Sequence, residues 1–203
     1  MKKVFLFLMV IGVPIALIAK GPSTGLEPIK LNQPNLERGK SLMHSLSERH
    51  SERNYSDKQL SLQDLSDLLW AANGINRPDG HRTAPSSMNK QDILLYVALP
   101  EGTYFYNHKT HILEPVSEGD HRQKIRGNMP ALNIILVAAQ GERETALMNV
   151  GYVAQNIYLV CTALDMATVS CRGSMDSDAF AKACKLKNKQ SILLQHPVGY
   201  PKE

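Results

Sequence analysis

The stretch that decides the fold is Glu144-Thr-Ala-Leu-Met-Asn-Val-Gly-Tyr-Val-Ala-Gln-Asn-Ile-Tyr-Leu-Val-Cys-Thr-Ala-Leu-Asp165. Its apolar residues recur at steps of three and four, which is the spacing of one face of an α-helix. The residues on this face are Leu147, Val150, Ala154, Ile157, Cys161 and Leu164. The pattern predicts the longest helix of the chain, packed in the core. Gln155 and Asn156 interrupt its middle, and buried amides need hydrogen-bond partners.

Outward from this helix, shorter runs alternate between strand and helix patterns. Ser61 followed by Asp64 is an approximate capping box, and it predicts a helix that ends at Asn73-Gly74. Two further helices are expected over residues 35–46 and 176–184. Strands are expected over residues 93–99, 103–107, 110–115, 131–138, 168–172 and 190–198, with the second and third forming a hairpin. The fold class is therefore α+β, with a mixed or antiparallel sheet flanked by helices.

The first 20 residues have the layout of a secretory signal peptide. Lys2 and Lys3 precede an apolar run of about 16 residues, Val4 to Ala19. A membrane span needs roughly 20 apolar residues, so a cleaved leader is favoured over an anchor, which stays the alternative. We expect an exported, periplasmic protein with three parts: the leader at 1–20, an irregular arm at 21–35 that is rich in proline and glycine, and one domain at 36–203.

Charge and cysteine content exclude several classes of protein. Without the leader, which holds three lysines and no acid, 20 basic side chains face 19 acidic ones. Such a balance does not favour nucleic-acid binding, which needs a basic face. Cys161, Cys171 and Cys184 are odd in number and lack the spacing of a metal site, so no metal is expected. A disulfide is the less favoured alternative to Cys161 acting as a small core residue.

Two polar segments carry the functional signal. Arg49-His-Ser-Glu-Arg53 places two guanidiniums and a hydroxyl at alternate positions. If the segment is extended, these three side chains point the same way and can grip a phosphate. Ala84-Pro-Ser-Ser-Met-Asn-Lys-Gln91 supplies hydroxyls and an amide, which suit the edge of a heterocycle. Together they suggest a phosphorylated ring cofactor.

Each segment also has a simpler interpretation. Arg49 and Arg53 could be surface residues that pair with Glu48 and Glu52. The serines at 86 and 87 could cap a helix, since serine is favoured at that position.

The chain resembles the flavin-dependent nitroreductase superfamily, in particular small bacterial members related to heterocycle-oxidising dehydrogenases. The segments that carry the resemblance occur in the family's order: Arg49–Arg53, Leu69–Asn76, Arg82–Gln91, Gly151–Leu159 and Val198–Pro201. The resemblance implies a nitroreductase-like fold and a homodimer that binds FMN at its interface, with the long helix in the dimer core.

The same resemblance implies roles for particular residues. Arg49 and Ser51, beside His50, would hold the FMN phosphate, and Arg53 would lie by the pyrimidine edge. Pro85, Ser86, Ser87, Met88 and Asn89 would line the ring from the other subunit. The stretch 169–173, with Arg172 and Gly173, would pass the flavin largely through backbone groups.

The activity implied is an oxidoreductase reaction by a ping-pong mechanism. Electrons would pass from NAD(P)H or another donor through FMN N5 to a small organic acceptor, with no general acid or base assigned. The alternative is an exported, non-catalytic flavin- or ligand-binding protein with the same fold.

Overall fold

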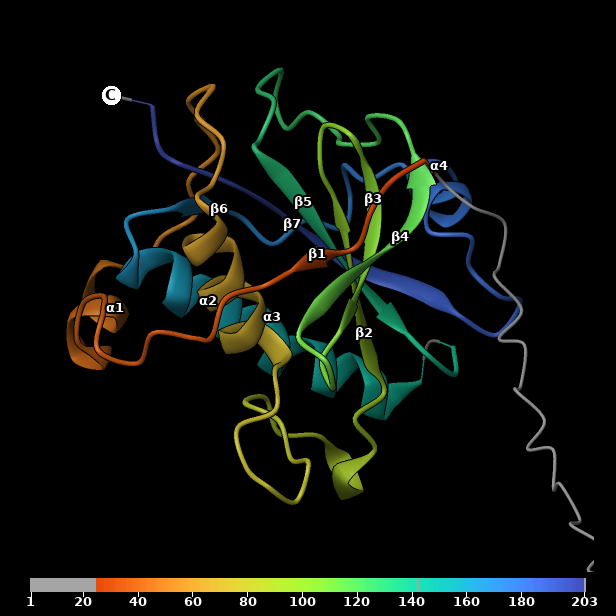
Figure 1. Ribbon diagram of the computed structural model, residues 1–203, viewed down its shortest axis with the longest axis horizontal. Coiled ribbons are helices and arrows are strands. Elements are labelled where there is room, and N and C mark those ends of the chain that lie inside the picture. The colour runs from red at the N-terminus through yellow and green to blue at the C-terminus, as the bar shows by residue number, and fades with distance from the viewer. Residues whose placement is uncertain (1–24, 142, 203) are drawn as a thin grey trace, which may run out of the picture.

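The computed structural model describes residues 25–141 and 143–202, which build a single seven-stranded sheet with four α-helices. The strand order is β1-β4-β3-β2-β5-β7-β6, and every neighbouring pair is antiparallel. The expected α+β class is confirmed, with the sheet antiparallel (Figure 1). The elements are β1 Ile29–Lys30, α1 Leu42–Glu48, α2 Leu62–Asn73, η1 Ser87–Asn89 (a 3₁₀ turn), β2 Ile93–Ala98, β3 Gly102–Asn107, β4 Ile112–Glu118, β5 Leu132–Ala138, α3 Glu144–Ala163, β6 Ala167–Thr168, α4 Ser177–Ala183 and β7 Ser191–Gly199.

The predicted leader lies outside the described residues, as does the start of the arm. Across residues 25–141 and 143–202, none of the helices combines the length and the apolar character that crossing a membrane requires. The hypothesis of a leader or an anchor therefore stays a prediction.

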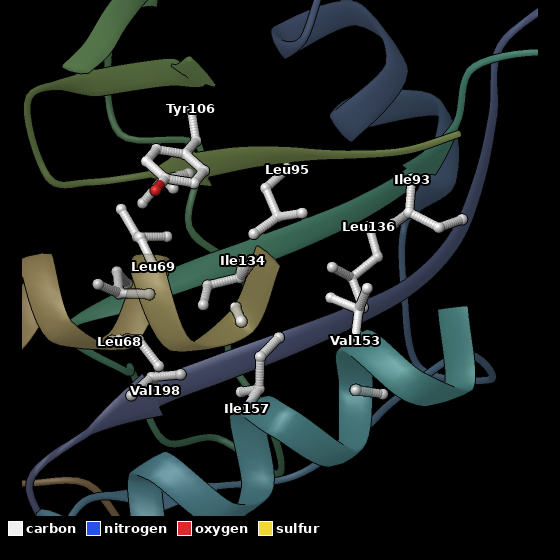
Figure 2. Packing of buried hydrophobic residues seen from close by; sticks show 14 of the residues in the cluster. Leu68, Leu69, Ile93, Leu95, Tyr106, Ile134, Leu136, Val153, Ile157 and Val198 are labelled. Atoms are coloured by element: carbon white, nitrogen blue, oxygen red, sulfur yellow. The ribbon is translucent and has the colours of Figure 1, made fainter. Parts of the chain in front are cut away.

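Both faces of β2 are covered, which explains its unbroken apolar sequence. Leu95 and Val97 of β2 pack in the cluster formed with α2 and α3 (Figure 2). Tyr96 and Ala98, which point to the other face because side chains alternate along a strand, pack against Phe180 of α4. Because both faces are buried, the sequence of this strand does not alternate between polar and apolar residues.

Helix α2 has the predicted bounds and cap. The Ser61 hydroxyl accepts a hydrogen bond from the backbone N–H of Asp64 at 3.0 Å. The helix ends at Asn73, where the N–H of Gly74 donates to Trp70 O. A capped start and a glycine end are local signals, so the sequence predicts this element well.

The long helix is also confirmed, as α3. Val150, Ile157 and Cys161 of its predicted apolar face are buried. The two amides separate: Gln155 is exposed, whereas Asn156 donates to the Ala72 carbonyl of α2 at 3.5 Å.

Three local predictions are wrong or incomplete. Residues 35–41 are not helical, because Asn35 accepts from the N–H of Glu37 and its own N–H donates to Asp67 of α2. These side-chain bonds replace a first helical turn. The arm contains β1, which pairs with β4. The strand predicted over 168–172 shortens to β6, after which Cys171 only bridges Gln195.

The predicted hairpin and the thiol state agree with the structure. β3 and β4 pair antiparallel around the turn at His108-Lys109. Cys161, Cys171 and Cys184 are all free thiols, and the first and third are buried.

Candidate functional site

The segment that follows α1 runs beside β6 and directs two of its side chains at one residue of α3. The backbone N–H of Glu52 donates to the carbonyl of Thr168 at 2.9 Å. Arg49 Cζ lies 5.1 Å from the centroid of the Tyr158 ring, and Ser51 Oγ lies 3.0 Å from the Tyr158 hydroxyl oxygen. The shared direction predicted for Arg49, Ser51 and Arg53 is confirmed for Arg49 and Ser51 and is wrong for Arg53.

The residues between and after them take other directions. His50 is exposed, and its Nδ1–H donates to the carbonyl of Glu48 at 2.8 Å. Its side chain lines an open pocket together with Lys40. Arg53 is half-buried and its guanidinium folds back to donate to the Ser51 carbonyl at 3.5 Å. The structure thus brings Arg53 to the edge of the Arg49–Ser51 group and places His50 on the opposite side.

The carboxylates next to these arginines are engaged elsewhere. Glu48 pairs with Lys40 at 2.7 Å, and Glu52 accepts from the two backbone N–H groups that follow it, at 2.6 and 2.7 Å. Those hydrogen bonds lower the pKa of both carboxyls. Among the described residues, Arg49 and Arg53 have no carboxylate within ion-pair distance. The simpler interpretation, in which they pair with Glu48 and Glu52, is therefore wrong.

Tyr158 is the contact that sequence reasoning missed. Its hydroxyl accepts a hydrogen bond from the backbone N–H of Ser170 at 2.8 Å, so it joins the Arg49–Arg53 segment to the residues after β6. The His196 ring packs against the Tyr158 ring in a T-shaped arrangement, with centroids 5.2 Å apart and planes at 81°. Burial lowers the pKa of His196 to about 3, so this ring is uncharged at neutral pH. The available signal was a polar aromatic tip within the apolar run Ile157–Cys161.

The stretch after Ser170 turns outward. Arg172 and Gly173 are exposed in the turn between β6 and α4. Just before them, the backbone of Cys171 exchanges two hydrogen bonds of 2.9 Å with Gln195 of β7. The sheet therefore holds this stretch next to the Arg49–Arg53 segment.

The second predicted segment forms an exposed turn with unusual backbone angles. Met88 and Asn89 have φ values of +53° and +52°, in the left-handed region that non-glycine residues rarely adopt. The side chain of Met88 is 88% exposed. Strained backbone of this kind gathers at binding and catalytic sites, where the surrounding structure maintains it.

Asn149 of α3 holds this turn in place. It is 1% exposed, its Oδ1 accepts from the N–H of Ser87 at 2.9 Å, and its Nδ2 donates to Asp92 at 2.8 Å. The hydroxyl of Ser86 accepts from the N–H of Gln91 at 2.9 Å and does not cap η1. Capping the 3₁₀ turn is thus not the role of this serine.

The two segments contact different ends of α3 (Figure 1). Asn149 and Tyr158 are nine residues apart, which is about 13.5 Å along a helix axis. Within one chain, the structure assembles Arg49, Ser51 and Arg53 with the stretch around Ser170, and it keeps the turn from Pro85 to Asn89 at a distance.

Comparisons with known proteins give the family of the chain. The sequence profile described as the nitroreductase family matches residues 46–200. A nitroreductase-type protein of Methanocaldococcus jannaschii is 29% identical over 198 residues, which cover 85% of this chain and 97% of the relative.

Solved structures give the same result. A nitroreductase-type protein of Ralstonia eutropha JMP134 superposes with a TM-score of 0.81 at 31% identity, over 90% of this chain and 93% of that one. An FMN-dependent nitroreductase of Clostridium difficile R20291 shares the fold, with a TM-score of 0.55 at 17% identity over 79% of this chain and 88% of that one. With the profile match covering most of the chain, the protein belongs to the nitroreductase family of flavin-dependent oxidoreductases.

Proposed function

We propose that the flavin is FMN and that the protein passes electrons from NAD(P)H or a comparable donor to a small organic acceptor. The observation that carries this proposal is the group of Arg49, Ser51 and Arg53, in which neither guanidinium has a carboxylate partner among the described residues. A guanidinium and a hydroxyl that converge without an acid, with a second guanidinium at their edge, match a phosphate, which Arg binds through charge-assisted hydrogen bonds.

The residues fit FMN in two parts. Arg49 and Ser51 would hold the phosphate, and Arg53 would stabilise negative charge on the reduced ring. The turn from Pro85 to Asn89, with its exposed and strained backbone, would line the ring. The named relative from Clostridium difficile is an FMN-dependent enzyme of the same fold. His50 faces away from this group, so we assign it no contact with the phosphate.

The two parts come together in a homodimer, in which the partner subunit supplies the ring-lining turn. Their anchors on α3 lie about 13.5 Å apart within one chain, and the proposed interface would bring a second turn to each Arg49–Ser51 group. The outer face of α3 also supports it, because Leu147, Met148 and Tyr152 are 42%, 52% and 42% exposed. Apolar side chains gathered on one helix face mark a contact with another protein surface.

In the proposed reaction, the side chains of the protein bind and orient the flavin. When bound, FMN would supply hydride acceptance and donation at N5, while the protein orients and tunes it. One site would serve donor and acceptor in turn, which is a ping-pong mechanism. The side chains described above bind and orient, and none is assigned as a general acid or base.

The test uses the purified protein with added FMN. We expect a yellow complex, with flavin absorbance retained after gel filtration, that bleaches when NADH or NADPH is added without oxygen. Colour without bleaching would point to another electron donor or to a non-catalytic flavin-binding protein. A protein that takes up no FMN would contradict the proposal.

Export through the predicted leader is a separate proposal. It rests only on the basic and apolar pattern of residues 1–20. N-terminal sequencing of the protein from a fractionated bacterial host checks it, and an intact Met1 in the cytoplasmic fraction would contradict it.

A further inference from the structure

We propose that Tyr158 is a positioning residue of the phosphate grip, and that it orients the Ser51 hydroxyl and the Arg49 guanidinium toward the same anion. The proposal rests on the proposed function, because the anion is the FMN phosphate. It concerns a residue of the long helix whose ring and hydroxyl contact the two phosphate-binding side chains.

The direction of the hydrogen bonds follows from the groups involved. A backbone N–H can only donate, so the Tyr158 oxygen accepts from Ser170, at 2.8 Å. The hydroxyl hydrogen of Tyr158 can then be donated to Ser51 Oγ, 3.0 Å away. The Ser51 hydroxyl then keeps its own hydrogen for an acceptor outside the protein. Within the described residues, Ser51 Oγ has no second hydrogen-bond partner. A chain of hydrogen bonds that runs in one direction strengthens its last donor.

The ring of Tyr158 acts on the other phosphate-binding side chain. Arg49 Cζ lies 5.1 Å from the ring centroid, within the range of a cation–π contact. The guanidinium thus has a surface to stack on that leaves its N–H groups free for an anion. A carboxylate in the same place would compete with the phosphate.

Buried groups behind the tyrosine hold it in this orientation. The fully buried His196 ring packs against it in a T-shaped arrangement. Thr168 donates to the carbonyl of Pro197 at 2.9 Å, so its hydroxyl oxygen accepts from His196 Nδ1, 3.2 Å away. His196 therefore has one tautomer and one position, and Tyr158 rests on a rigid support.

The experiment compares FMN with riboflavin, which lacks the phosphate. Fluorescence titration gives the Kd of both flavins for the wild type, Tyr158→Phe, Ser51→Ala and the double variant. Tyr96→Phe is the control, because it removes a tyrosine hydroxyl on the opposite face of the sheet. Thermal unfolding of each variant shows whether the fold is kept.

We expect Tyr158→Phe and Ser51→Ala each to raise the FMN Kd about 3- to 10-fold, the effect of losing one hydrogen bond. The riboflavin Kd should change less than about 2-fold for both, and Tyr158→Phe should add nothing to Ser51→Ala, because both remove the same chain of bonds. An unchanged FMN Kd, or equal losses for FMN and riboflavin, would overturn the proposal. A wild type that binds riboflavin as tightly as FMN would overturn it too, while the flavin-dependent activity would stand. A wild type that takes up no FMN would also contradict the proposed function.

Discussion

At the scale of single residues, the availability of Arg49 for an anion depends on what the neighbouring carboxylates bind. Lys40 forms an ion pair with Glu48, and two backbone N–H groups donate hydrogen bonds to Glu52. Both acids that adjoin the arginines in sequence therefore bind other donors. The guanidinium of Arg49 is left to stack on Tyr158, which keeps it available for an anion.

Replacing this arginine tests the phosphate grip directly. Arg49→Ala should weaken FMN binding by about 1.5–3 kcal/mol, the scale of a hydrogen bond to a charged group. Isothermal titration with FMN measures the change. The control is Lys109→Ala, which removes an exposed cation from the β3–β4 turn. An FMN affinity equal to that of the control would remove Arg49 from the site.

The half-buried His108 and the fully buried His196 predict how stability depends on pH. Burial lowers the pKa of His108 to about 4 and that of His196 to about 3, below the value near 6.5 of the unfolded chain. As the pH falls below about 6.5, the unfolded state takes up protons first. The stabilising contribution is therefore complete above pH 6.5 and is lost as the pH falls toward 3.

Urea unfolding between pH 7.5 and pH 4.5 checks this dependence, and the midpoint should fall over that range. His108 accepts a hydrogen bond from the buried guanidinium of Arg82, at 2.9 Å, only while it is neutral. His108→Gln should therefore show a shallower decline with pH than the wild type. Equal midpoints at both pH values would refute the assignment.

At the scale of elements, α3 carries the anchors of both segments. Its first third holds the turn at Ser87 through Asn149, and its last third holds the Arg49–Arg53 segment through Tyr158. The inner face of the same helix packs on the sheet (Figure 2). One rigid rod thereby sets the spacing of the two segments within a chain.

Removing the first anchor should loosen one segment only. Asn149→Ala leaves the Ser87 N–H and one oxygen of Asp92 without their buried partner, which costs about 1–3 kcal/mol of unfolding free energy. Hydrogen exchange should accelerate across residues 86–92 and stay unchanged across 168–171. Asn188→Ala, at an exposed position, is the matched control. Uniform acceleration over the whole chain would show that Asn149 supports the fold generally rather than the turn.

At the scale of the whole molecule, helices α1 and α3 expose large apolar side chains to solvent. Met43 of α1 is 75% exposed and Met148 of α3 is 52% exposed. The two helices pack against each other, so their exposed residues belong to neighbouring elements. In the proposed homodimer, a second copy of the chain would cover them and bring the turn that we propose to line the ring.

A charge on this surface should separate the subunits and release the cofactor together. Met148→Glu is expected to halve the mass measured by light scattering and to lower FMN occupancy, because a buried unpaired carboxylate opposes association. Asn188→Glu places the same charge on an exposed residue of the α4–β7 connection and should change neither quantity. A wild type that is monomeric at micromolar concentration would contradict the dimer.

The sequence by itself determined the elements whose causes are local. Helices α2 and α3 follow from periodic apolar residues, and the cap at Ser61 follows from a four-residue pattern. Strands β2 and β5 follow from apolar runs. The same local reasoning failed over residues 35–41, where bonds to Asp67 of α2 replace the helix.

The tertiary structure alone decided the partners of the functional residues. Ser51 contacts Tyr158 across 107 residues, and Ser87 contacts Asn149 across 62. No periodicity or spacing encodes such pairs, because they form when the sheet and α3 pack together. Helix α3 therefore has two roles. Its buried face builds the core, and its polar residues Asn149 and Tyr158 position the turn at Ser87 and the Arg49–Arg53 segment.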